Sequence, residues 1–312
     1  MNDTVLVTGA AGFAGSHLVE LLAASGPVTA WTHASPPPPD LLDLATWQRV
    51  DLLDRSAVLH AVRTLRPAVV YHCAGSPHVA ESWHDTTTPL TSNVMATHHL
   101  LESLGRAGRR ARVLIPGSAT VYADSPTPIA ETHALHPTSP YAVAKLAQEQ
   151  LAFRAIVEDG VEVVVTRSFN HTGPRQTPRF AAPSFARQVA LIERGQGEAV
   201  LKVGNLDALR DITDVRDVVR AYAVLMAGGR SGEVYNVCSG VGRPMRAVLD
   251  GLVARARVPV RIEQDPARMR PHDTPALVGD PSRLRDATGW APTISFDRML
   301  DDLLDYWRRV IA

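Results

Sequence analysis

A glycine-rich segment between an apolar run and a helical pattern constrains the fold of this chain more than any other feature. Residues 8–15 read Thr-Gly-Ala-Ala-Gly-Phe-Ala-Gly, between the apolar run 4–9 and the helical pattern 13–25. Glycines at this spacing allow a tight turn, close approach of the backbone to a pyrophosphate and close helix–strand packing, and the helix N-terminus offers free N–H groups to the phosphates. A plain turn is the alternative, but the strand and helix around it favour dinucleotide binding. Five residues are expected to hold the dinucleotide: Gly9, Gly12, Phe13, Ala14 and Gly15.

Short apolar runs alternate with helical patterns through the first half of the chain. Strands are expected at 4–9, 27–31, 68–73, 111–116 and 161–167 and in a run ending at 49–51, and helices at 13–25, 56–65, 89–107 and 141–159. Strands that are apolar throughout and separated by helices indicate a parallel sheet covered on both faces. We therefore predict an α/β protein with a Rossmann-type, doubly wound parallel sheet and helices on both faces.

The alternation breaks near residue 170, where loops rich in Pro, Gly and Arg mix with helical patterns at 183–194, 214–227, 245–256 and 297–310. We predict a dinucleotide-binding domain over 1–168, to which segments around 210–240 return. Residues 169–312 are expected to form mainly a smaller, substrate-binding lobe. Four prolines within 35–40 predict an exposed linker, because proline joins neither helix nor sheet.

Charge and cysteine content exclude several classes of protein. Lys plus Arg is 32 and Asp plus Glu is 32, and this zero net charge disfavours nucleic acid or an anionic membrane as a partner. Two cysteines, Cys73 and Cys238, are too few for a disulfide scaffold or a zinc cluster. No apolar run reaches about 18 residues, and the first residues lack the features of a signal peptide. We expect a cytoplasmic protein with no membrane span and no metal.

The ends of the second and third strands are expected to meet the adenosine part of the dinucleotide. An acidic residue at the end of the second strand would favour NAD, whereas this chain has Thr32 and His33 there. NADP(H) is therefore favoured and NAD(H) remains possible. Asp51 and Leu52 end the third strand, where they could face the adenine or begin the next helix.

Tyr141 and Lys145 open a helical pattern four residues apart, so the phenol and the ammonium share one face. A phenol has a pKa near ~10, and a nearby cation lowers that pKa. Such a tyrosine exchanges a proton with a sugar hydroxyl or ketone. Ser118 follows the fifth strand, at the edge where open α/β sheets place their sites. A solvated Tyr/Lys pair is common, but with the glycine loop upstream the pattern predicts a catalytic set of Ser118, Tyr141 and Lys145.

Together these residues resemble the extended short-chain dehydrogenase/reductase family, which comprises nucleotide-sugar epimerases, dehydratases and reductases. The matching segments span nearly the whole chain: GAAGFAG (9–15), DLLD (51–54), YHCAGSPHV (71–79), SATVY (118–122), SPYAVAK (139–145) and RDITDVRD (210–217). The resemblance implies a Rossmann domain with a C-terminal substrate lobe. It also implies that Tyr141 and Lys145 contact the cofactor, and that its diphosphate and nicotinamide ribose lie on a loop of His72, Ala74 and Gly75.

Three segments within the family pattern, 168–188, 203–222 and 265–284, resemble GDP-4-dehydro-6-deoxy-D-mannose reductases. This implies that NAD(P)H reduces the C4 ketone of that sugar to give GDP-D-rhamnose. A nucleotide-sugar 4-epimerase with tightly bound NAD is the alternative. A 4,6-dehydratase is disfavoured, because it needs a carboxylate where this chain has Thr120. A regulatory protein that senses the cofactor is disfavoured, because Tyr141 and Lys145 are both present.

The implied GDP-sugar carries a diphosphate, which arginine binds with paired hydrogen bonds. The candidates for the diphosphate are Asn170, Arg179, Arg187, Arg210 and Arg270, those for the base or ribose are Lys202 and Asn205, and those for the hexose are Glu81 and Ser82.

The helical patterns 89–107 and 141–158 resemble the pair through which this family forms homodimers, and we expect a homodimer. Apolar residues on these helices fit a core or an interface equally well: Leu100, Leu101, Leu104, Leu146 and Phe153.

Overall fold

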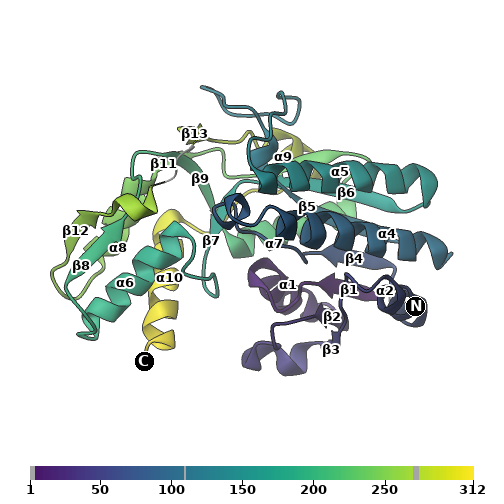
Figure 1. Cartoon of the computed structure of the whole chain (residues 1–312), viewed down its shortest axis with the longest axis horizontal. Helices are drawn as coiled ribbons and strands as arrows, with labels where there is room; N and C mark the ends of the chain where they lie inside the picture. The colour runs from purple at the N-terminus through teal and green to yellow at the C-terminus, as the bar shows by residue number, and fades with distance from the viewer. Residues whose placement is uncertain (1–3, 109, 270–273) are drawn as a thin grey trace.

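A seven-stranded parallel sheet organises the computed structural model, which describes residues 4–108, 110–269 and 274–312 (Figure 1). Its strand order is β10-β6-β5-β4-β1-β2-β3. The order reverses between β1 and β4, and open α/β sheets bind their ligands at such a point. The strands are β1 (Val5–Thr8), β2 (Val28–Thr32), β3 (Thr46–Arg49), β4 (Val69–His72), β5 (Arg112–Ser118), β6 (Glu162–Ser168) and β10 (Val234–Val237). The predicted parallel sheet is confirmed.

Helices cover both faces of the sheet, as its unbroken apolar strands require. In β1, Val7 belongs to a buried cluster with α1 (Phe13–Ala23) and α7 (Val215–Gly228). Its neighbour Leu6 belongs to a second cluster with α2 (Arg55–Leu65), α4 (Ala96–Arg106) and α5 (Pro140–Glu158). Consecutive strand residues point to opposite faces, so each apolar run serves both clusters.

The helix expected over 89–107 is not regular. A short turn α3 (Thr87–Pro89) leads into a π-helical segment, Leu90–Met95, before α4 begins. π-Helical segments widen the helix locally and are frequent at functional sites. Leu100, Leu101 and Leu104 of α4 are fully buried within the chain, which assigns them to the core. Leu146 and Phe153 are only partly buried.

The C-terminal half builds a second core and also returns to the sheet (Figure 1). This core lies among α6 (Ala181–Glu193), α8 (Met245–Ala254), α10 (Phe296–Val310) and the strand pair β8 (Val200–Val203) and β12 (Arg261–Gln264). A further small sheet joins β9 (Leu209–Asp214) to β7 (Asn170–Thr172), β11 (Gly242–Pro244) and β13 (Ala276–Leu277). Strand β10 joins the main sheet, and α9 (Ser282–Thr288) packs on α7. The domain boundary at residue 168 stays a prediction.

The proline segment 35–40 differs from the expected linker. Pro39 begins a 3₁₀ helix, Pro39–Leu44, because a proline fits the first turn of a helix, where its missing N–H is not needed. Asp40 Oδ2 of this helix lies 3.7 Å from Arg175 Nη1. Arg175 Nη2 donates to two side chains of α1, to Glu20 Oε2 at 2.5 Å and to His17 Nδ1 at 2.7 Å. Arg175 follows β7, so its guanidinium ties the C-terminal half of the chain to the sheet domain.

We expect Leu100→Ala to lower the free energy of unfolding by about 2–5 kcal/mol, because it leaves a cavity in the core. The exposed Leu42 offers a matched control, and Leu42→Ala should change that free energy by no more than about 0.5 kcal/mol. Urea denaturation and mass in solution would be measured for both. Unchanged stability with a reduced mass would instead assign Leu100 to an interface.

Candidate active site

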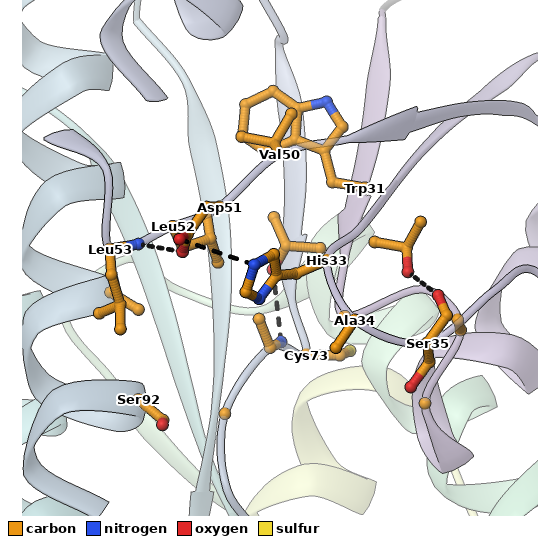
Figure 2. Close-up of a pocket in the computed structure, with 18 of the residues that line it drawn as sticks. Trp31, His33, Ala34, Ser35, Val50, Asp51, Leu52, Leu53, Cys73 and Ser92 are labelled. Carbon is orange, nitrogen blue, oxygen red and sulfur yellow. Dashed lines mark hydrogen bonds and ion pairs between the residues drawn. The ribbon is translucent and has the colours of Figure 1, made fainter. Parts of the chain in front are cut away.

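A cavity of about 340 Å³ lies at the carboxyl ends of β1, β2, β3 and β4, where the dinucleotide was predicted (Figure 2). Eight predicted residues line it: Gly9, Gly12, Thr32, His33, Asp51, Leu52, Ala74 and Gly75. Phe13, Ala14 and Gly15 form the first turn of α1 and lie outside the lining. His72 also lies outside it, buried, with its ring nitrogens 2.8 Å from the hydroxyls of Thr8 and Thr97.

Two positions of the loop, Gly9 and Gly15, must be glycine because other backbone atoms lie too close to admit a side chain. Gly9 has φ +63°, and a Cβ on it would lie 2.6 Å from the Ala74 backbone. A Cβ on Gly15 would lie 2.2 Å from the carbonyl oxygen of Gly9. Real atoms do not approach so closely, so both positions exclude a side chain. The loop therefore packs closely against the segment that follows β4 and leaves the N-terminus of α1 open to an anion.

Asp51, which was predicted to face the adenine, reaches the end of β2, a contact that local sequence order did not reveal. Asp51 Oδ2 lies 3.6 Å from His33 Nε2, and both side chains are about half exposed (Figure 2). Thr32 donates a hydrogen bond to the Ser35 carbonyl oxygen. The end of β2 has no acid of its own, as predicted, but Asp51 reaches it from the segment after β3.

Ser118 and Tyr141 meet at the carboxyl end of β5. Tyr141 stands in the first turn of α5, whose N-cap Ser139 accepts a hydrogen bond from the Ala142 N–H at 3.1 Å. Burial raises the pKa of Tyr141 to about 12, and a hydrogen bond with Ser118 opposes this rise. Ser118 Oγ also lies 2.9 Å from the hydroxyl of Thr120. Tyr141 is therefore a neutral phenol at pH 7 and can give up a proton only to a stronger base.

Lys145 does not act on Tyr141 as the sequence predicted. Its ammonium donates to the Pro116 carbonyl oxygen and to Gln148 Oε1, both at 2.7 Å. Burial lowers the pKa of Lys145 to about 8. The expected lowering of the Tyr141 pKa was wrong for this structure, because burial of the phenol dominates and the ammonium is held by other acceptors.

A second, larger cavity of about 640 Å³ lies beside the C-terminal half of the chain. Asn170, Arg179, Asn205 and Arg210 line it, four of the residues predicted for the substrate. The side chain of Arg210 is nearly buried, and its guanidinium donates to the Leu209 carbonyl oxygen at 2.9 Å. The lining combines these polar groups with apolar side chains, which suits a ligand that has both polar and apolar parts.

An aromatic pair joins the start of α1 to the wall of the second cavity. The ring of Phe13, at the start of α1, stacks on His171, with centroids 5.7 Å apart and planes at 7°. His171 lines the second cavity. The loop beside the first cavity is thus in direct contact with the wall of the second.

Other predicted substrate residues lie elsewhere. Arg187 and Lys202 are exposed and lie outside the lining of both cavities, so the structure gives no support to their predicted contact with the substrate. Ser82 is buried and donates to the Val79 carbonyl oxygen at 2.7 Å, which satisfies its hydroxyl away from the cavity. Glu81 also lies outside the lining, and its carboxylate binds Arg179 at 2.9 Å. Arg270 lies outside the described residues.

Sequence reasoning missed two residues that shape these cavities. Asn93, in the π-helical segment, accepts from the Ser76 N–H at 2.9 Å and donates to the Ser76 carbonyl oxygen, and so holds the loop after β4. The sequence could have indicated this role, because Asn93 and Thr97 are polar residues on a helix face that is otherwise apolar and buried. Arg268 lines the second cavity and precedes the predicted Arg270 by two residues.

Within the described residues, no helix is long and apolar enough to cross a membrane. The same part of the chain contains no group of three or more His, Cys, Asp or Glu side chains placed to hold a metal ion.

A doubly wound sheet with a glycine cradle at its switch point and a Ser/Tyr/Lys set on the neighbouring strand and helix defines an enzyme of the short-chain dehydrogenase/reductase class. The family model described as GDP-mannose 4,6 dehydratase matches residues 6–303. A GDP-6-deoxy-D-mannose reductase of Pseudomonas aeruginosa is 38% identical over 310 residues, covering 98% of both chains. The chain therefore belongs to the extended short-chain dehydrogenase/reductase family, as the sequence motifs predicted.

Solved structures agree with this assignment. The structure of RMD from Pseudomonas aeruginosa complexed with NADPH superposes with a TM-score of 0.86 at 35% identity, covering 99% of this chain and 100% of that one. A UDP-glucose 4-epimerase of Thermus thermophilus in complex with NAD gives a TM-score of 0.87 at 29% identity, covering 98% and 99%.

We expect Gly15→Ala to weaken dinucleotide binding at least tenfold, about 1.4 kcal/mol, because the new Cβ would collide with the Gly9 carbonyl oxygen and displace the loop. Calorimetric titration with NADPH would measure the change. Gly26→Ala is the matched control, since no atom lies within 4 Å of its added Cβ, and its affinity should equal that of the wild type. Equal affinities for all three proteins would contradict the proposed cradle.

Proposed function

We propose that this enzyme reduces the C4 ketone of GDP-4-dehydro-6-deoxy-D-mannose to give GDP-D-rhamnose, with hydride from NADPH. The observation that carries the proposal is the identity of 38% to a GDP-6-deoxy-D-mannose reductase across 98% of both chains. The Ser118–Tyr141 pair supports it, since it provides the proton that such a reduction consumes.

The first cavity fits a dinucleotide on its own geometry. The cradle made by Gly9 and Gly15 admits no side chain, and the N-terminus of α1 opens beside it. NADP(H) is favoured, because the structure of RMD from Pseudomonas aeruginosa, on which this chain superposes, is a complex with NADPH; NAD(H) remains an alternative, since the epimerase neighbour is a complex with NAD. When bound, the reduced nicotinamide supplies the hydride for C4.

The chain's own residues would supply the proton and the polarisation. Tyr141 would donate its phenolic proton to the C4 oxygen as the carbonyl becomes an alkoxide, so that one hydride and one proton give the alcohol. Ser118 would donate a hydrogen bond to the same oxygen while charge develops there. Two N–H groups of the Lys145 ammonium donate to Pro116 and Gln148. The third would donate to the nicotinamide ribose.

The reductase has stronger support than the epimerase, since the reductase relative is 38% identical and the Thermus thermophilus epimerase 29%. Burial raises the pKa of Tyr141, which keeps the phenol in the protonated form that a reductase needs. A dehydratase would further need a carboxylate two residues after Ser118, where Thr120 instead bonds to the Ser118 hydroxyl.

The second cavity would hold the GDP-sugar. Arg210 and Arg179 supply positive charge for the diphosphate, and Asn170 and Asn205 supply amide groups for the sugar and nucleoside. Arg179 would exchange its exposed partner Glu81 for a phosphate, and an exposed ion pair is weak enough to permit that exchange.

We further propose a homodimer formed through the helical segments 89–107 and 141–158, in the cytoplasm. Val143 and Val157 of α5 support the dimer, because they remain 48% and 86% exposed on its surface. Two free cysteines and a nucleotide-sugar substrate fit a reducing compartment.

The proposed reaction is tested by following NADPH absorbance with GDP-4-dehydro-6-deoxy-D-mannose. We expect one NADPH oxidised per sugar, a slower rate with NADH, and a product whose C4 configuration NMR assigns to rhamnose. If neither NADPH nor NADH is oxidised, the proposed reductase activity is refuted and the 4-epimerase becomes the favoured alternative.

Tyr141→Phe serves as the control for this assay. It removes only the phenolic hydroxyl, so kcat should fall by about 10²–10⁴-fold while NADPH binding persists. Full activity of this variant would show that another group donates the proton.

We expect Arg210→Met to raise KM for the GDP-sugar about 10- to 100-fold, because it removes a charge-assisted hydrogen bond to the diphosphate. Arg187→Met makes the same change on an exposed surface outside the cavity and should leave KM unaltered. Steady-state kinetics of both variants would decide. Equal effects at the two positions would contradict the assignment of the second cavity.

A further inference from the structure

A chain of buried hydrogen bonds leads from the Lys145 ammonium to the floor of the first cavity. Lys145 Nζ lies 2.7 Å from Gln148 Oε1, and Gln148 Nε2 lies 2.7 Å from Thr97 Oγ1. Thr97 Oγ1 lies 2.8 Å from His72 Nε2, and His72 Nδ1 lies 2.8 Å from Thr8 Oγ1. Thr8 and His72 end adjacent strands, and Thr8 lines the cavity.

The chemistry of the side chains fixes the direction of every bond in this chain. An ammonium only donates, so Gln148 must present its carbonyl oxygen to Lys145 and its NH₂ to Thr97. The Thr97 hydroxyl donates to the Asn93 carbonyl oxygen at 2.6 Å, so it must accept from both Gln148 and His72. His72 therefore carries its proton on Nε2 and accepts from the Thr8 hydroxyl at Nδ1.

The intermediate residues have no exposure that would let water replace these bonds. Thr8, His72, Thr97 and Gln148 are all buried to within 1%. A buried polar group left without its partner is costly, so loss of one bond of the network destabilises the others. The positions of these side chains therefore determine the position of the Lys145 ammonium.

We propose that Gln148 is a positioning residue for Lys145, and that the chain Gln148–Thr97–His72–Thr8 fixes the Lys145 ammonium relative to the dinucleotide cavity. Gln148 touches neither cavity, so its role is indirect. The inference rests on the proposed function in one respect: Lys145 serves the reaction only if the site is catalytic.

The titratable groups that face Lys145 leave its own titration easy to observe. His72 and Cys73, from the end of β4, interact electrostatically with Lys145. Burial lowers the pKa of His72 to about 3 and raises the pKa of Cys73 to about 12, and Tyr141 on the same helix has a pKa near 12. Between pH 5 and 10, these three neighbours therefore stay neutral.

The sequence provides a direct probe, because it contains two lysines, Lys145 and the exposed Lys202. Trace acetic anhydride acetylates free amines and not ammonium groups, so peptide mass spectrometry across a pH series gives a midpoint for each lysine. The free enzyme suffices, with no substrate or turnover. Gln148→Leu removes an acceptor of the ammonium and should lower the Lys145 midpoint by about one pH unit. Gln148→Glu adds a carboxylate and should raise it by about one to three units.

Gln196→Leu, the same change at an exposed position outside both cavities and both helical segments proposed for the dimer, is the matched control, and Lys202 is the internal reference. Opposite shifts at Lys145, with both controls unchanged, support the proposal, as does a kcat lowered about tenfold at constant KM in Gln148→Leu. Unchanged Lys145 midpoints in both Gln148 variants would overturn it. If Gln148→Leu does not fold, Gln148→Glu alone decides. If the wild type oxidises no NADPH, the proposed function is refuted. The acetylation midpoints would still test whether Gln148 positions Lys145, because they need no turnover.

Discussion

The architecture of the site depends on one backbone contact, between the Gly9 turn and Ala74 at the ends of β1 and β4. Any side chain on Gly9 would occupy the space of the Ala74 backbone. Because the two loops touch without side chains between them, the N-terminus of α1 comes close to the sheet edge and Thr8 comes within hydrogen-bond distance of His72. The first contact shapes the dinucleotide cavity, and the second begins the network that reaches Lys145. The same pair of strand ends thus shapes the cavity and anchors the network that reaches Lys145 on α5.

The parts of this site that could be predicted from the sequence depend on local spacing. A strand, a glycine loop and a helix in succession have one common outcome in α/β proteins, and Gly9 lies at the cavity while Gly15 lies in the first turn of α1, against the Gly9 carbonyl oxygen. Tyr141 was expected to open its helix, and the structure places it in the first turn of α5, after the N-cap Ser139 and Pro140, both of which favour helix initiation. The unbroken apolar strands also predicted the two covered faces of the sheet.

The other features of the site depend on packing between segments far apart in the chain, which the spacing of residues in the sequence does not reveal. Asp51 reaches His33 because β3 lies beside β2. The pKa of Tyr141 was expected to fall, but burial has the larger effect, and burial is a property of the whole fold. Arg187 and Lys202 were predicted for the substrate from charge and position in the sequence. Charge alone does not tell which side of a helix or strand faces a cavity, and both lie on the outer side.

The exposed position of Lys202 on β8 has a practical consequence for handling this enzyme. Its positive side chains are almost all arginines, which amine-reactive supports do not capture. Of its two lysines, Lys202 alone is exposed, on a strand of the C-terminal half that borders neither cavity. Molecules coupled to an activated surface through a lysine side chain would therefore all be held at Lys202 and share one orientation. Lys202→Arg would abolish that uniform attachment.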